Sequence, residues 1–137
     1  MDLNACEEKG FVRITNKNSS LVKSLLEMSE MKEKVVSSTI LDDSNICAFI
    51  PMAYDSLREI LEAICVMNGY KVTSHICIDK LLETIYLDCS FTEFDRFRYI
   101  RNSINYYGKK ISLEAGRQII KKIFKFREKM ITILKQG

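Results

Sequence analysis

The segment from Phe97 to Gly108 holds the side chains of this chain that are best suited to binding chemistry. Its polar members, in sequence order, are Arg101, Asn102, Asn105, Tyr106 and Tyr107. A guanidinium keeps its charge at physiological pH and donates five hydrogen bonds, so it suits a phosphate group. In a helix, Arg101, Asn105 and Tyr106 can share one face. The segment therefore predicts a site that grips a phosphodiester or the edge of a base.

A purely structural role for Arg101 is the alternative. Arg101 follows Phe97 by one helical turn, which places it near a buried edge. A buried guanidinium needs an acidic or carbonyl partner. The nearest suitable carboxylates in an earlier amphipathic segment are Asp55, Glu59 and Glu62. Pairing with one of them would make Arg101 an anchor between two helices.

Charge is distributed unevenly along the chain. Residues 1–90 contain 9 basic and 14 acidic residues, whereas residues 91–137 contain 12 basic and 4 acidic ones. A basic carboxy-terminal third can attract phosphates, and the alternative is a solvated helix face neutralised by the acidic part of the fold. The basic residues closest to the Arg101 segment, which we expect to assist binding, are Arg96, Arg98, Lys109 and Lys110.

Several other chemistries have no support in the sequence. Neither a GxxxxGK[ST] nor a GxGxxG phosphate-binding motif is present, and no GxSxG motif occurs. The five cysteines form no CxxC pair, and there is a single histidine, so we predict neither a metal site nor a cofactor. Because the cysteine count is odd, Cys47, Cys65 and Cys77 are expected to be reduced, small buried residues.

His75 is the only histidine in the chain. Its place near the start of a predicted helix favours a capping or core hydrogen bond. A role as a catalytic base is the alternative.

No membrane segment is expected. The longest stretch without a charged residue runs from Ser44 to Tyr54, whereas crossing a bilayer takes about 20 residues. The amino terminus lacks the basic start and apolar run of a secretory signal. The sequence therefore predicts a cytoplasmic protein.

Apolar residues that recur every three or four positions predict about five amphipathic helices. Residues 1–18 form a poorly patterned lead-in, with a short extended piece near Val12, and residues 19–137 form a single helical domain. The short connections favour antiparallel neighbours, and so an all-α, up-and-down bundle. The expected amino-terminal caps are Ser19 or Ser20, Asp42 to Ser44, Thr73 or Ser74, Thr92, and Ser112.

Glycine and proline mark several helix boundaries. Gly69 and Gly108 follow the second and fourth predicted helices, where a left-handed residue commonly ends a helix. Pro51 fits the first turn of the second helix if that helix begins near Ile50, and otherwise it implies a kink.

Two segments resemble the HEPN domain family. The run from Tyr54 to Ala63, followed by Asn68-Gly69-Tyr70-Lys71 and His75, resembles the second-helix region of these domains. The run from Arg101 to Gly108 resembles the later signature, in which an Arg and a polar residue precede a His by four to six positions. The two segments occur in the order found in the family, and the resemblance spans roughly residues 20–134.

The resemblance implies a bundle of about five helices that forms a homodimer, in which two signature helices face each other across a cleft. Active members cleave RNA there without a metal, and many accompany a minimal nucleotidyltransferase in a toxin–antitoxin pair. On this sequence, Arg101 fills the Arg position and Asn102 the polar position. The His is missing, because positions 106 to 108 hold Tyr106, Tyr107 and Gly108. Imidazole titrates near pH 6.5 and a phenol near pH 10, so Tyr106 would be a weak substitute.

Three hypotheses follow from the sequence. The first is a HEPN-like dimer that binds RNA or a nucleotide through Arg101, Asn102 and Tyr106, with weak or no nuclease activity. The second is a metal-independent ribonuclease toxin. The third is a structural partner of a nucleotidyltransferase, in which Tyr106 or Tyr107 would be open to modification by that partner.

Overall fold

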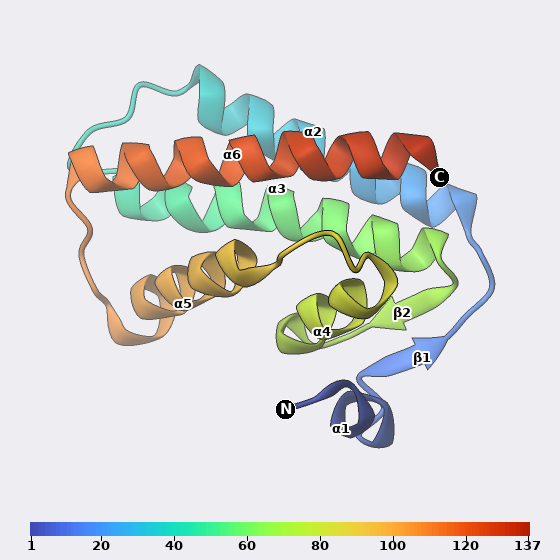
Figure 1. The fold of residues 1–137 in the computed structure, drawn as a ribbon. Helices are drawn as coiled ribbons and strands as arrows, with labels where there is room; N and C mark the ends of the chain where they lie inside the picture. The colour runs from blue at the N-terminus through green and yellow to red at the C-terminus, as the bar shows by residue number, and fades with distance from the viewer.

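Helix α3 (Ile46–Met67) lies at the centre of the fold in the computed structural model, which describes residues 1–137 (Figure 1). Helices α2 (Ser19–Ser38) and α6 (Leu113–Gln136) pack along one side of α3. The shorter helices α4 (His75–Ile85) and α5 (Thr92–Tyr107) cover its other side. The prediction of an all-α bundle is confirmed as far as the helical architecture is concerned. None of its helices combines the length and the apolar character that a bilayer crossing demands.

The helix ends agree with the predicted boundaries, with small corrections to the caps. Asn18, rather than Ser19 or Ser20, caps α2, because its Oδ1 accepts a hydrogen bond from the Leu21 amide at 3.1 Å. Ser112 caps α6 as predicted. Thr92 is already the first residue of α5, and Phe91 precedes it. Gly108 ends α5 with a φ of 64°, a left-handed conformation that glycine adopts without steric cost.

The start of α3 differs from the late start that the sequence allowed. Asp42 accepts hydrogen bonds from the amides of Ser44 and Asn45, which holds the turn before the helix. Because α3 therefore begins at Ile46, Pro51 lies inside the helix and leaves the carbonyl of Cys47 without its usual partner.

The first 18 residues are ordered by contacts with distant parts of the chain. Helix α1 (Leu3–Glu8) leads into strand β1 (Val12–Ile14), which confirms the short extended piece. Strand β1 pairs antiparallel with β2 (Tyr70–Val72), with Val12 opposite Val72. Neither α1 nor β2 was predicted, because six- and three-residue elements carry too little periodicity to be recognised locally.

A disulfide joins Cys6 of α1 to Cys77 of α4, with 5.9 Å between their Cα atoms. The prediction that Cys77 is reduced is therefore wrong, whereas Cys47 and Cys65 are free. The partners are 71 residues apart in the sequence, so no local motif announces the bond. Disulfides are typical of oxidising compartments and rare in most cytosolic proteins, so the cytoplasmic location stays a prediction.

A chain of buried polar contacts links the three long helices. Arg127 of α6 is 3% exposed, and its Nε donates a hydrogen bond to the Ser29 hydroxyl of α2 at 2.9 Å. Ser29 donates in turn to the carbonyl of Ser56 in α3. We call Ser29, Ser56 and Arg127 the Arg127 cluster. It fixes the relative positions of α2, α3 and α6, because a buried polar group is stable only when it is hydrogen-bonded.

Candidate anion-binding site

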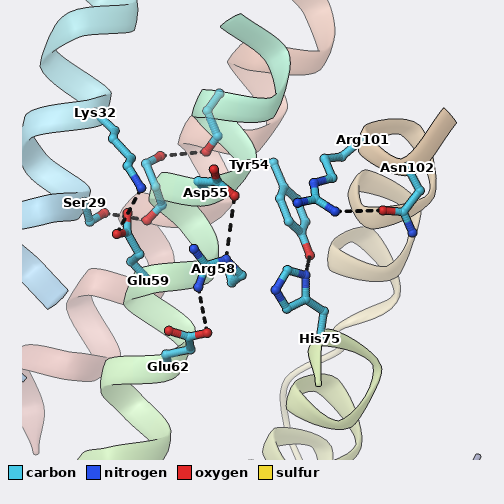
Figure 2. A network of polar contacts seen from close by, with 12 residues as sticks. Ser29, Lys32, Tyr54, Asp55, Arg58, Glu59, Glu62, His75, Arg101 and Asn102 are labelled. Carbon is cyan, nitrogen blue, oxygen red and sulfur yellow. Dashed lines mark hydrogen bonds and ion pairs between the residues drawn. The ribbon is translucent and has the colours of Figure 1, made fainter. Parts of the chain in front are cut away.

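Helix α3 contributes an unusual set of polar side chains to the side covered by α4 and α5. Tyr54, Arg58 and Glu62 follow one another at four-residue intervals, and Asp55 adjoins them (Figure 2). Tyr54 is fully buried, and this burial raises the pKa of Tyr54 above its usual range against the opposing effect of Arg101. Tyr54 is therefore neutral at physiological pH and acts as a hydrogen-bonding group.

His75, the first residue of α4, meets this hydroxyl. Its Nδ1 lies 3.1 Å from the Tyr54 Oη (Figure 2). Burial, followed by the nearby charges of Arg58 and Arg101, lowers the pKa of His75 from 6.5 to about 4. The ring is therefore neutral near pH 7. The expected core hydrogen bond of His75 is confirmed.

Helix α5 brings Arg101 over the face of Tyr54, with its guanidinium carbon 5.8 Å from the ring centroid. Its Nη1 donates to Asn102 Oδ1 at 3.0 Å and to the Tyr106 hydroxyl at 3.3 Å. The Tyr106 ring also lies 5.6 Å from the guanidinium carbon. Arg101 is thus held between two aromatic rings by neutral partners, an arrangement that retains its positive charge.

No carboxylate pairs with Arg101, so the anchoring alternative is wrong. Asp55 and Glu62 instead pair with Arg58, at 3.6 Å and 2.7 Å. Glu59 faces the opposite side of α3 and pairs with Lys32 at 3.1 Å. Because every candidate carboxylate already has another partner, the charge of Arg101 is left available.

Three arginines surround Tyr54 and His75. The Nε atoms of Arg58, Arg98 and Arg101 are buried and make no hydrogen bond, although Arg58 Nε lies 3.6 Å from the Asp55 carboxylate. All three charges also act on the titration of His75 and Tyr54, which places them around the same pair of residues. Buried polar atoms without a hydrogen bond are rare in proteins. Because Glu59 and Arg127, on the opposite side of α3, each retain one as well, these atoms do not by themselves distinguish the site.

The predicted site residues fall into three groups. Arg98, Arg101, Asn102 and Tyr106 come together around Tyr54, and Arg98 also pairs with Asp95. Arg96 instead lines a groove between α5 and α6, away from this cluster. The predicted residues that are exposed and make no side-chain hydrogen bond with Arg101 are Asn105, Tyr107, Lys109 and Lys110.

Tyr54 and Arg58 belong to the site, although residue chemistry alone did not single them out. A signal existed, because both residues sit on the helix with the most continuous burial in the chain. An arginine on such a helix needs compensation, and i,i+3 and i,i+4 carboxylates at Asp55 and Glu62 supply it.

No protein-family model matches the chain, and no curated protein or solved structure is significantly similar to it. A fixed cation, a neutral imidazole and a neighbouring amide together suit a phosphate group and the hydroxyl beside it. No three His, Cys, Asp or Glu side chains gather anywhere in a metal-ligand arrangement.

Proposed function

We propose that this chain is a HEPN-like dimeric protein that binds RNA or a nucleotide at the Arg101 site, with weak or no nuclease activity. One observation carries the proposal. Arg101 is half-buried, has only neutral partners, and keeps an Nη2 group that makes no hydrogen bond and is not buried. Such a cation is suited to a phosphate, because charge-assisted bonds to phosphate are among the strongest hydrogen bonds in proteins.

The titration of His75 favours binding over cleavage. A general base works best when its pKa is close to the working pH. With a pKa of about 4, His75 is fully deprotonated at pH 7 but takes up a proton only weakly. Its neutral ring is better suited to hydrogen-bonding a ribose hydroxyl than to removing the proton of that hydroxyl.

The test is the fluorescence anisotropy of a short, labelled single-stranded RNA titrated with protein. Arg101→Ala should weaken binding about 10- to 100-fold, which corresponds to about 1.5–3 kcal/mol for a hydrogen bond to a charged group. Arg101→Lys should recover only part of the affinity, because an ammonium lacks the planar fork. Affinity should also fall between about 50 and 200 mM salt.

Arg117→Ala is the matched control, since Arg117 is an exposed arginine of α6 whose side chain hydrogen-bonds only to the Leu41 carbonyl. It removes the same charge and should change the affinity less than threefold by the general loss of attraction. Equal losses in Arg101→Ala and Arg117→Ala would refute a specific role for Arg101. RNA binding that ignores ionic strength would refute the phosphate contact.

The dimer is part of the proposal and has its own test. Two copies that face each other would place two Arg101 side chains along one ligand. Light scattering coupled to gel filtration should give twice the chain mass of 15.9 kDa. A monomer at concentrations that bind RNA would remove the shared cleft, although not the single site.

A metal-independent ribonuclease is the second candidate, and the contact between His75 and Tyr54 beside Arg101 favours it. In this reaction the ribose 2′-oxygen attacks the adjacent phosphorus, and His75 accepts the hydroxyl proton. The bond to the 5′-oxygen breaks, that oxygen takes a proton from water, and a 2′,3′-cyclic phosphate remains. RNA that is cut in EDTA by the native protein but not by His75→Ala would support cleavage. RNA left intact at high protein concentration would exclude it.

A further inference from the structure

A groove separate from the Arg101 site runs between α5 and α6, with a volume of about 770 Å³. Phe97 and Ile100 of α5 and Ile119 and Phe126 of α6 form its apolar part. The rings of Phe97 and Phe126 meet edge to face, 6.5 Å apart. Its polar lining consists of Ser90, Glu93, Arg96, Lys122, Lys125 and Lys129.

The groove carries a surplus of positive charge. Arg96, Lys122, Lys125 and Lys129 are all exposed, and none of the four takes part in an ion pair. Glu93 is the only acidic residue in the lining. Four cations around an apolar strip repel one another, so an occupant with negative charge would be favoured by complementarity.

The spacing of the lysines indicates an extended occupant. Lys122, Lys125 and Lys129 follow an i, i+3, i+7 pattern on one face of α6, a span of about 10 Å along the helix axis. The single headgroup of a fatty acid would meet only one or two of them. A row of this kind matches an occupant that carries several negative charges in a line.

The apolar part of the groove favours an amphipathic helix over single-stranded nucleic acid as the extended occupant. Single-stranded nucleic acid binds largely by stacking its bases on exposed aromatic faces. Phe97 and Phe126 are only 3% and 7% exposed, so they offer no such face. The accessible apolar groups are Ile100 and Ile119, both half-buried. An aliphatic strip beside a row of cations fits the apolar and acidic faces of an amphipathic helix.

We propose that this groove binds an acidic amphipathic helix of a partner protein. Leucine-like side chains of that helix lie between α5 and α6, against Ile100 and Ile119. Its Asp and Glu residues face Lys122, Lys125 and Lys129. The proposal is independent of the Arg101 site, since the groove contains neither Arg101 nor any of the side chains that hydrogen-bond to its guanidinium or lie against it.

The test uses a fluorescent synthetic peptide of about 18 residues, which forms about five helical turns. Leucines follow an i, i+3, i+4, i+7 pattern, with glutamates at the flanking positions. A second peptide has the same composition in scrambled order, so that its leucine stripe is lost. Anisotropy should show at least tenfold weaker binding of the scrambled peptide, because only the ordered one presents a continuous apolar face.

Charge reversal in the chain gives a matched comparison. The variant Lys122→Glu with Lys125→Glu removes two groove cations and should bind the ordered peptide at least tenfold more weakly. The control, Lys121→Glu with Lys135→Glu, makes the same change in net charge at exposed positions of α6 outside the groove. The affinity of this control for the ordered peptide should fall less than threefold. All four lysines are exposed, so helix content by circular dichroism should be unchanged.

Four outcomes would overturn the proposal. Equal losses in the two variants, or equal binding of both peptides, would mean general charge attraction. A groove variant that weakens RNA binding as much as peptide binding would assign the groove to nucleic acid. A groove variant that turns a dimer into a monomer by light scattering would identify a second copy of the chain as the occupant.

Discussion

Arg101 is half-buried and Arg127 is buried, and their surroundings differ in polarity and access. Arg127 is sealed among α2, α3 and α6, where Ser29 accepts a hydrogen bond and the largely exposed Glu128 lies 3.3 Å away. Arg101 lies on the other side of α3, with two aromatic rings, an amide and no carboxylate (Figure 2). The arrangement around Arg127 stabilises the packing of the core, and the arrangement around Arg101 leaves its charge accessible to a ligand.

Burial alone does not identify a functional arginine. Both guanidinium groups retain an unsatisfied buried nitrogen, Nη2 in Arg127 and Nε in Arg101. The two sites differ in what could still reach them. Arg127 is 3% exposed, whereas Arg101 is only half-buried and has other unsatisfied arginines beside it. Variants should therefore separate stability from binding.

The largest expected effect comes from the Cys6–Cys77 disulfide, which belongs to the Arg101 side because Cys77 lies two residues after His75. Closing a loop of this length should stabilise the fold by about 4 kcal/mol in the chain-entropy description. Cys6→Ser should lower the urea midpoint accordingly, and Cys89→Ala, which alters a free cysteine, should not. Hydrogen exchange should speed up in α1 and α4 more than in α6. Equal acceleration on both sides of α3 would contradict this division.

Arg127→Ala should be the most damaging arginine variant and should lower the free energy of unfolding by about 3 kcal/mol. It deletes a long buried side chain and leaves the hydroxyl of Ser29 without its donor. Arg127→Met should retain much of the stability, since its apolar stem keeps the packing. RNA affinity, measured well below the melting temperature, should be unchanged in both variants.

Arg101→Ala should show the reverse pattern. The free energy of unfolding, measured with urea, should fall by less than about 1 kcal/mol, because the partners of Arg101 are neutral and can hydrogen-bond to water instead. Its cost should appear in RNA affinity instead. If Arg101→Ala lowered the free energy of unfolding as much as Arg127→Ala, both arginines would be core residues. The distinction between a stabilising and a binding arginine would then be wrong.

The pH dependence of stability should carry the signature of His75. Because its pKa is lowered in the folded state to about 4, the unfolded chain binds more protons in this range. Stability contributed by the neutral ring is present above about pH 6.5 and is lost as the pH falls towards 4. The charges that face His75 are Arg58 and Asp55 from α3 and Arg98 and Arg101 from α5.

Another buried group acts in the opposite direction. Burial, followed by Asp95, raises the pKa of Asp79 to about 6, so Asp79 stabilises the fold as the pH falls from 6 towards 4. His75→Gln should therefore be compared with the native protein at pH 7 and pH 5. Between pH 7 and pH 5, the free energy of unfolding should fall by roughly 1 kcal/mol more in the native protein than in the variant. This figure allows for the partial exposure of the ring. Identical pH profiles would contradict the burial of His75.

Tyr106→Phe should have the smallest effect. It removes the hydroxyl that accepts from Arg101 at 3.3 Å but keeps the ring beside the guanidinium. RNA affinity should fall less than about threefold, since this long, solvent-exposed hydrogen bond only orients Arg101 and the ring stays in place. Tyr107→Phe, at an exposed position without such a contact, is the control and should match the native protein. A loss of tenfold or more in Tyr106→Phe would make the phenol a principal contact.

The long helices were predictable because their signals are local. Periodic apolar residues marked α2, α3 and α6, and Gly108 marked the end of α5. Strand β2 and the bond from Cys6 to Cys77 were not predictable, because each depends on a partner more than 50 residues away.

The same limit applies to the site. Arg101 and Asn102 stood out by residue type, but the sequence left Asp55, Glu59 and Glu62 as competing partners. Only the packing of α3 shows that Arg58 takes two of these carboxylates and Lys32 the third. Arg96 and Arg98 are two residues apart, and a helix turns them to different faces, so one lies in the groove and the other beside Tyr54.

The most direct test observes both arginines in one experiment. In ¹⁵N-labelled protein, the Nε–H signals of Arg101 and Arg127 can be assigned from Arg101→Lys and Arg127→Lys and followed while a short single-stranded RNA is added. The Arg101 signal should shift and saturate together with RNA binding, while the Arg127 signal stays in place. An Arg101 signal that does not move at saturating RNA would contradict the claim that this cation is held for a phosphate.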